Sequence, residues 1–267
     1  MSMQRAPSGE MPFLDHLEEL RYRLLWSLGA LVVCMMVAFA VVWQYDVIGF
    51  LSTPIQPFLR SGKLIYTHPA DPFSIVLKVA FGLGLVGAGP IIAYHVWAFL
   101  SPALYSKEKK VVLPVILGAT GLFLTGVYLA VRWVLPAMFG VLLSFQSASL
   151  EQMISAREYF SFALSLSLAC GGAFQLPIVI LALTALGVVT PTILAKYRRH
   201  AMVGSLVAAA IITPGDLLIM TAMLGVPLYG LYELSIVISW FVYRRKLKAA
   251  KDRAAAEESE RIGGAAT

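Results

Sequence analysis

Charged residues are scarce in this chain. Only 13% of its 267 residues are Asp, Glu, Lys or Arg, whereas 59% are hydrophobic. An ordinary soluble domain carries about 25% charged residues. So few charged residues cannot cover the surface of a soluble protein with this much apolar area. We therefore expect the chain to place its hydrophobic residues against lipid. The composition predicts an integral membrane protein.

Cysteines and enzyme signatures are also few. Cys34 and Cys170 lie in apolar runs and form no Cys-x-x-Cys pair, which excludes a disulfide framework. The four histidines have no metal-ligand spacing, and His-Glu-x-x-His, Gly-x-Ser-x-Gly and phosphate-binding loops are absent. Gly82-x-Gly84-x-x-Gly87 matches a dinucleotide fingerprint but lies in an apolar run, so we interpret it as close helix packing. We expect no enzymatic activity, no cofactor and no metal.

Long apolar runs dominate what is present. A transmembrane helix needs roughly 20 apolar residues. The fold class predicted is an all-α membrane protein with six transmembrane helices, the last two short. The predicted spans are residues 24–43, 73–99, 111–135, 159–186, 201–212 and 217–243.

The fifth predicted span is unusually short. Residues 201–212 extend for roughly 18 Å as a helix, against a hydrocarbon core of ~30 Å. Whether the last two segments cross the bilayer fully stays open. We expect one membrane domain over residues 1–245 and a polar, disordered tail over 246–267.

Lys and Arg are distributed unevenly between the two sides. With six spans, residues 1–23, 101–110, 187–200 and 244–267 share one side and contain sixteen Lys and Arg, whereas the opposite loops contain three. The positive-inside rule then places both termini in the cytoplasm. This distribution also accounts for the net charge of +6 without a nucleic-acid partner. The outer loop 45–72 contains four prolines and predicts a structured cap.

Five polar residues lie in the spans or at their edges, namely Lys78, Arg132, Gln175, Asp216 and Glu233. Ionisable groups in lipid are costly and mark either function or pairing. Lys78 and Asp216 lie near the outer edge, where they can reach water. Glu233 lies deeper and needs a partner or a wet cavity. Gln175 precedes Pro177 in mid-span, and both a helix–helix hydrogen bond and a substrate-facing role are open for it.

These intramembrane residues support an alternative function. A small secondary transporter needs a polar site at broken helices near the bilayer midplane, and Gln175, Pro177 and Glu233 are the candidates for one. Uptake of a small solute by purified protein in vesicles would favour this alternative. An intramembrane hydrolase ranks last, because no nucleophile–base pair is evident.

A charged amphipathic helix over residues 11–25 leads into the first span. Its Glu19 stands among basic residues at the membrane edge, as does Glu108 in the loop 101–110. Local pairing is the simpler interpretation, since Arg23 follows Glu19 by one helical turn. Such surface pairs contribute only ~0–1 kcal/mol, so either carboxylate could still bind a better cationic ligand.

Three motifs along the chain stand out: His16-Leu17-x-Glu19-Leu20-Arg21-x-Arg23-Leu24, Trp97-Ala98-Phe99-x-x-Pro102-x-Leu104-Tyr105-x-x-Glu108 and Thr213-Pro214-x-Asp216. They resemble the motifs of one family, the C subunit (TatC) of the bacterial twin-arginine protein translocase. Together, and in this order, they are highly specific, and the resemblance extends over about residues 12–245.

The resemblance implies a function for the cytoplasmic face. The family binds twin-arginine signal peptides of folded cargo, recruits the single-span A and B subunits and uses the proton-motive force without a cofactor. Glu19 and Glu108 match its acidic signal-peptide contacts, and Arg21, Phe99 and Pro102 fall in the same recognition region. The position of Gln175 is often a glutamate in the family. We therefore expect a multi-pass protein of the bacterial cytoplasmic membrane that forms oligomers with further copies of itself.

Overall fold

The computed structural model describes residues 13–59, 63–100, 112–144, 153–213 and 218–264, and these ranges are almost entirely helical. A single isolated bridge between Ile65 and Ser155 is the β-structure within them. The all-α prediction is thus confirmed. The principal helices are α1 (Phe13–Gln44), α2 (Val47–Ser52), α3 (Asp71–Leu100), α4 (Val112–Leu129), α5 (Leu135–Leu142), α6 (Ala156–Ala173), α7 (Leu176–Leu186), α8 (Pro191–Lys196), α9 (Arg198–Ile212) and α10 (Leu218–Gly264).

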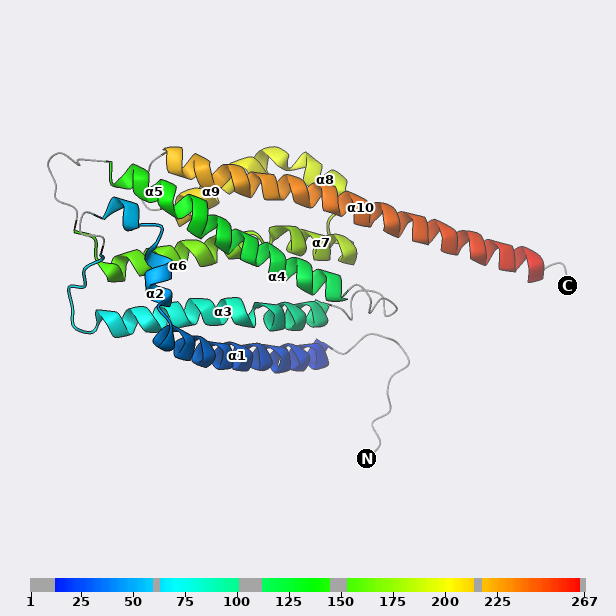
Figure 1. Cartoon of the computed structure of the whole chain (residues 1–267). Coiled ribbons are helices and arrows are strands. Elements are labelled where there is room, and N and C mark those ends of the chain that lie inside the picture. Colours follow the sequence, from blue (N-terminus) through cyan, green and yellow to red (C-terminus); the bar gives the residue numbers. More distant parts are fainter. Residues whose placement is uncertain (1–12, 60–62, 101–111, 145–152, 214–217, 265–267) are drawn as a thin grey trace, which may run out of the picture.

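The amphipathic N-terminal segment and the first span form one continuous helix, α1, which lies along α3 (Figure 1). Glycine permits this close packing: a Cβ added to Gly84 would lie 2.7 Å from the Cα of Met35. Real side chains do not tolerate such a contact, so a larger residue would force the two helices apart. The interpretation of Gly82-x-Gly84-x-x-Gly87 as a packing motif is confirmed at Gly84.

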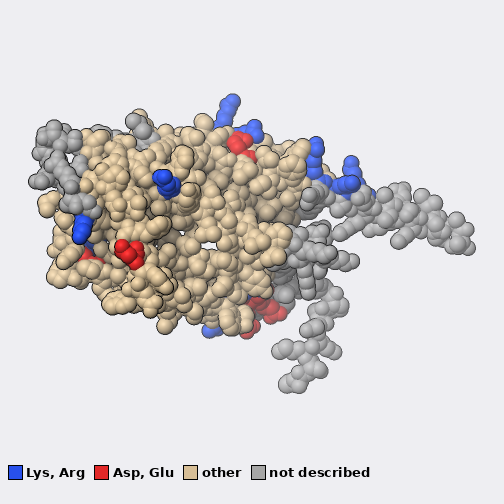
Figure 2. Space-filling view, viewed as in Figure 1, with Lys and Arg blue, Asp and Glu red and all other residues tan. Residues whose placement is uncertain are grey.

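Five helical segments of the described chain are long and apolar enough to cross a membrane. They are Asp15–Gln44, Asp71–Phe99, Leu113–Leu142, Ala156–Leu186 and Thr221–Arg244. The predicted fifth span lies in α9, which has 15 residues and does not reach this length. Charged side chains lie mainly toward the two ends of the face seen in Figure 2, and the middle of that face is largely uncharged.

Proline acts differently in two neighbouring spans. Residues 111–135 were predicted to end before Pro136, but the helix continues through a π-helical turn, Ala130–Val134, into α5. In this turn the N–H of Leu135 donates to Ala130 O, five residues back. The longer step lets the chain pass the proline, which has no N–H of its own.

The interruption predicted in span four is confirmed. Helix α6 ends at Ala173, and α7 restarts at Leu176 with Pro177 in its first turn, where a missing N–H is tolerated. Gly187 then ends α7 in the left-handed region, with φ of 83°. A side chain at this position would be strained, which explains glycine as the stop signal.

The loop 45–72 was predicted to form a structured cap, and the residues of it that the structure describes pack against the bundle. Ile55 is completely buried, and the hydroxyl of Tyr159 in α6 donates to Leu51 O at 2.6 Å. The backbone N–H of Ala156 donates to Ile65 O at 2.7 Å. These contacts tie the first outer loop to the start of α6 at the end of the bundle that holds α2 (Figure 1).

The C-terminal part of helix α10 differs from the sequence prediction. Residues 246–267 were expected to be disordered, but α10 is helical as far as Gly264 and projects from the bundle (Figure 1). Alanine is abundant in this stretch and favours helix over coil. Helix α1 begins at the same end of the bundle at which α10 ends.

Candidate functional site

Glu19 lies on α1, one helical turn before Arg23. The Nε of Arg23 donates to Glu19 Oε1 at 2.9 Å, and the Nη2 of Arg23 donates to the same oxygen. The local pairing expected from the sequence is therefore confirmed. Both donors use a single carboxylate oxygen, so the pair leaves the other oxygen, Oε2, without this partner.

The second oxygen of Glu19 faces a histidine. His16 Nδ1 lies 3.6 Å from Glu19 Oε2, too far for a hydrogen bond. The Oε2 atom is buried and accepts no hydrogen bond from any residue that the structure describes. A buried carboxylate oxygen without a donor is costly. The site therefore holds an acceptor that can still bind a cationic or N–H ligand.

His16 also joins α1 to α3. Its ring stacks on Phe99, with 4.3 Å between ring centroids and an interplanar angle of 11°. His16 thus contacts Phe99 and faces Glu19, two residues that their motifs had assigned to the same recognition region. His16 belongs to the first sequence motif but was given no role there, although its position one turn before Glu19 was a usable signal.

Four more site residues were predicted from the sequence. Arg21 is exposed on α1. Glu108 and Pro102 fall within 101–111, and Asp216 falls within 214–217, so these three lie outside the described residues. The described part of the candidate site consists of His16, Glu19, Arg23 and Phe99.

The predicted intramembrane polar residues have partners on other helices. The amide Nε2 of Gln175 donates to Ala119 O of α4 at 2.9 Å, which matches the helix–helix interpretation. Lys78 Nζ donates to Ser161 Oγ of α6 at 2.5 Å. The sequence did not reveal this contact between a lysine and a serine. Because the lysine is the donor, the contact does not activate the serine as a nucleophile.

Glu233 was predicted to need a partner or a wet cavity, and the structure gives it two partners. Its Oε2 lies 2.9 Å from Nη2 of Arg198, the first residue of α9, and its Oε1 accepts from the hydroxyl of Tyr229 at 2.7 Å. Gln175 and Glu233 are thus engaged with different helices. These contacts assign both residues to helix packing and give no support to a shared substrate site.

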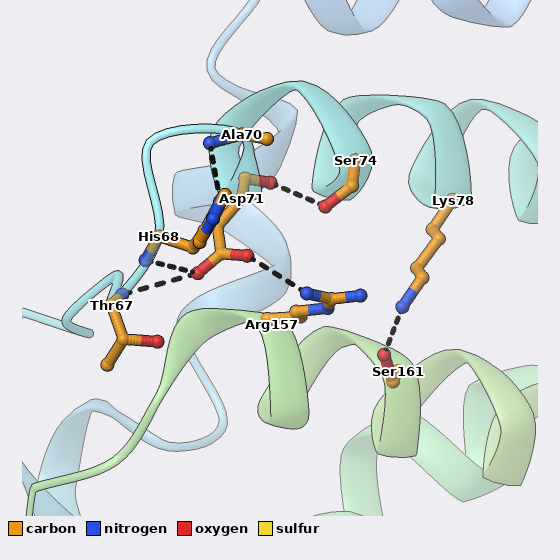
Figure 3. A network of polar contacts seen from close by, with 8 residues as sticks. All are labelled: Thr67, His68, Ala70, Asp71, Ser74, Lys78, Arg157 and Ser161. Atoms are coloured by element: carbon orange, nitrogen blue, oxygen red, sulfur yellow. Dashed lines mark hydrogen bonds and ion pairs between the residues drawn. The ribbon is translucent and has the colours of Figure 1, made fainter.

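A further polar network lies at the start of α3 and α6 (Figure 3). Asp71 is only 1% exposed and accepts from the backbone N–H groups of Thr67 and His68 at 3.2 and 3.0 Å. Arg157 Nη1 lies 3.5 Å from its other oxygen. Neither Asp71 nor Arg157 was singled out from the sequence. The network joins the loop before α3 to the start of α6, and among its described side chains no buried acceptor lacks a partner as Glu19 Oε2 does.

Comparison with known proteins identifies the family. A family profile described as "Sec-independent protein translocase protein (TatC)" matches residues 15–227. The chain is 38% identical to the TatC protein of Deinococcus radiodurans over 232 residues, which is 85% of each chain. It is 38% identical to TatCy of Bacillus subtilis, covering 94% of this chain and 98% of that protein. This chain belongs to the TatC family.

Solved structures agree with this assignment. A crystal structure of TatC, described as a twin-arginine translocase receptor, superposes with a TM-score of 0.74 at 36% identity. The match covers 85% of this chain and 99% of that one. The Escherichia coli K12 TatC protein is 33% identical, over 86% of this chain and 88% of its own length.

Membership of the TatC family makes the chain a component of the twin-arginine protein translocase, and so a transport protein that acts in a complex with other Tat subunits. The apolar helices agree with a multi-pass protein of the inner membrane. No group of three or more His, Cys, Asp or Glu side chains able to hold a metal occurs in the described part of the chain.

Proposed function

We propose that this TatC-family chain is the receptor and assembly core of the translocase. It binds the twin-arginine signal peptides of folded proteins at the cytoplasmic face. It then assembles with single-span A and B subunits, and with further copies of itself, for export driven by the proton-motive force. Both termini are cytoplasmic in this proposal, and α9 forms a short fifth span before α10.

The observation that carries the proposal is the half-occupied carboxylate of Glu19. Its Oε2 atom is buried and has no hydrogen-bond donor among the described residues. A guanidinium group of a signal peptide supplies such a donor together with a positive charge. Near the membrane this interaction is less screened than in bulk water, which strengthens it. Glu108 contributes the second acidic contact by its resemblance to the family motif.

The test is capture of a folded reporter by the purified chain. We expect an Arg-Arg signal to be recovered and a matched Lys-Lys signal to be lost. Glu19→Ala and Glu108→Ala should each weaken binding by roughly 1–3 kcal/mol, the range for a hydrogen bond to a charged group.

Glu18→Ala is the matched control. Glu18 is the neighbouring acid on α1 and is exposed, and its removal changes the net charge by the same amount. We expect it to leave recovery unchanged. Equal recovery of the Arg-Arg and Lys-Lys reporters would reject the receptor assignment. Unchanged crosslinking of the signal peptide to both the Glu19→Ala and the Glu108→Ala variant would also reject it.

A further inference from the structure

The contacts of Glu19 leave the selectivity for arginine unexplained. A guanidinium is usually distinguished from an ammonium by a bidentate contact with both carboxylate oxygens. Here Arg23 already donates twice to Oε1, so Oε2 is the oxygen of Glu19 that lacks a donor among the described residues. A lysine could satisfy a single oxygen as well as an arginine could. Another group must therefore contribute to the distinction.

We propose that His16 is a specificity-determining residue, and that its imidazole stacks against one guanidinium of a bound twin-arginine segment while that guanidinium donates to Glu19 Oε2. The inference rests on the proposed receptor function and assigns a residue to it. The ligand chemistry is that of a planar cation, which stacks on an aromatic ring in a way that a compact ammonium does not.

The geometry places the ring suitably for this role. Phe99 covers one side of the imidazole at 4.3 Å, and the two rings are nearly parallel. The side chain of His16 nevertheless remains 41% exposed. Its Nδ1 is 3.6 Å from Glu19 Oε2, so a group that stacks on the ring lies within reach of the open oxygen.

The arrangement also fixes the ring in place. Because His16 comes from α1 and Phe99 from α3, the packing of these two helices holds the imidazole beside the carboxylate. A ring held in this way loses little conformational freedom when the ligand binds. The sequence His16-x-x-Glu19 thus provides a flat surface and an acceptor within one helical turn.

The test measures binding of matched peptides that carry Arg-Arg, Arg-Lys, Lys-Arg or Lys-Lys to the purified full chain in lipid nanodiscs. We expect His16→Leu to weaken binding of the Arg-Arg peptide by roughly 3- to 30-fold, the range for a cation–aromatic contact. Binding of the Lys-Lys peptide should not change. His16→Phe should restore the preference for arginine, because it keeps a flat ring. The two mixed peptides identify which arginine is stacked.

Two further variants separate the possible failures. Tyr22→Leu removes another exposed aromatic ring from α1 and should leave the ratio of Arg-Arg to Lys-Lys affinity unchanged. Glu19→Gln tests the receptor function itself, and unchanged binding in that variant would reject the proposed function. If Glu19→Gln abolishes binding, an unchanged ratio in His16→Leu overturns the inference about His16 alone. Equal weakening of both peptides, or failure of His16→Phe to restore the ratio, also overturns it.

Discussion

At the scale of single residues, the polar groups within the helices fall into two classes. Gln175, Lys78 and Glu233 each contact another helix through a direct hydrogen bond or ion pair. Glu19 differs, because its partner Arg23 is on the same helix and one of its oxygens is buried without a donor among the residues that the structure describes. The three inter-helix contacts are therefore assigned to packing, and Glu19 remains the candidate for ligand binding.

The ion pair of Arg198 and Glu233 yields a prediction about stability. Arg198 is half exposed, and exposed pairs typically couple by only 0.2–1 kcal/mol. We expect a double-mutant cycle with Arg198→Ala and Glu233→Gln to give a coupling free energy of about 0.5–1 kcal/mol, measured by unfolding in detergent micelles.

Arg199→Ala provides the control for this cycle. Arg199 is the next residue of α9, is exposed and has no ion pair with any described residue. Its combination with Glu233→Gln should be additive. A coupling energy near zero for the Arg198 pair would mean that Glu233 is stabilised mainly by Tyr229, whose hydroxyl donates to it.

At the scale of elements, four prolines show why the sequence predicted some helix ends and missed others. Pro90 and Pro227 lie inside α3 and α10, which continue through them. Pro136 follows a π-helical turn, and Pro177 lies in the first turn of α7. Within a bundle, neighbouring groups and local changes of helix type can satisfy the carbonyl that proline leaves free. That compensation depends on tertiary packing, so it could not be predicted from residue type.

The short helix α9 leads to a second prediction. Its 15 residues extend for about 22 Å, less than the ~30 Å hydrocarbon core. We hypothesise that this mismatch thins the bilayer locally and helps a pore assembled from partner subunits to open nearby. Inserting four alanines after Val207 adds about one turn and should impair export of a twin-arginine reporter while leaving signal-peptide binding intact.

The same insertion after Lys251 serves as the control. This position lies in α10 beyond the candidate span, which ends at Arg244, so the bilayer should not be affected. Export should then proceed normally. Normal export with the lengthened α9 would disprove the role of mismatch, and loss of peptide binding would point to a folding defect instead.

At the scale of the whole molecule, the sequence predicted the helical class, the structured outer cap and the interruption of span four. Each follows from a local signal, namely long apolar runs, dense prolines or Pro177. The candidate site was predicted in part. Glu19 and Phe99 were recognised by their motifs, but the stacking of His16 on Phe99 joins residues 83 positions apart. Contacts of that kind, like the Asp71–Arg157 network, depend on how helices pack and leave no periodic signal in the chain.

The last prediction concerns orientation in the membrane. Helix α1 begins at the end of the bundle where α10 ends, and the uneven distribution of Lys and Arg predicts that this end is cytoplasmic (Figure 1). In a background with Cys34→Ala and Cys170→Ala, Thr53→Cys marks the exposed outer cap and Lys251→Cys the exposed face of α10. A membrane-impermeant maleimide should label the first in intact cells, and the second only after permeabilisation. A third variant, Asp216→Cys, lies between α9 and α10 in the sequence and tests whether α9 crosses the membrane. Labelling in intact cells supports six spans. Labelling only after permeabilisation would mean that α9 and α10 do not both cross. Labelling of the Lys251→Cys variant in intact cells would reverse the proposed orientation and would remove Glu19 from the side on which signal peptides arrive.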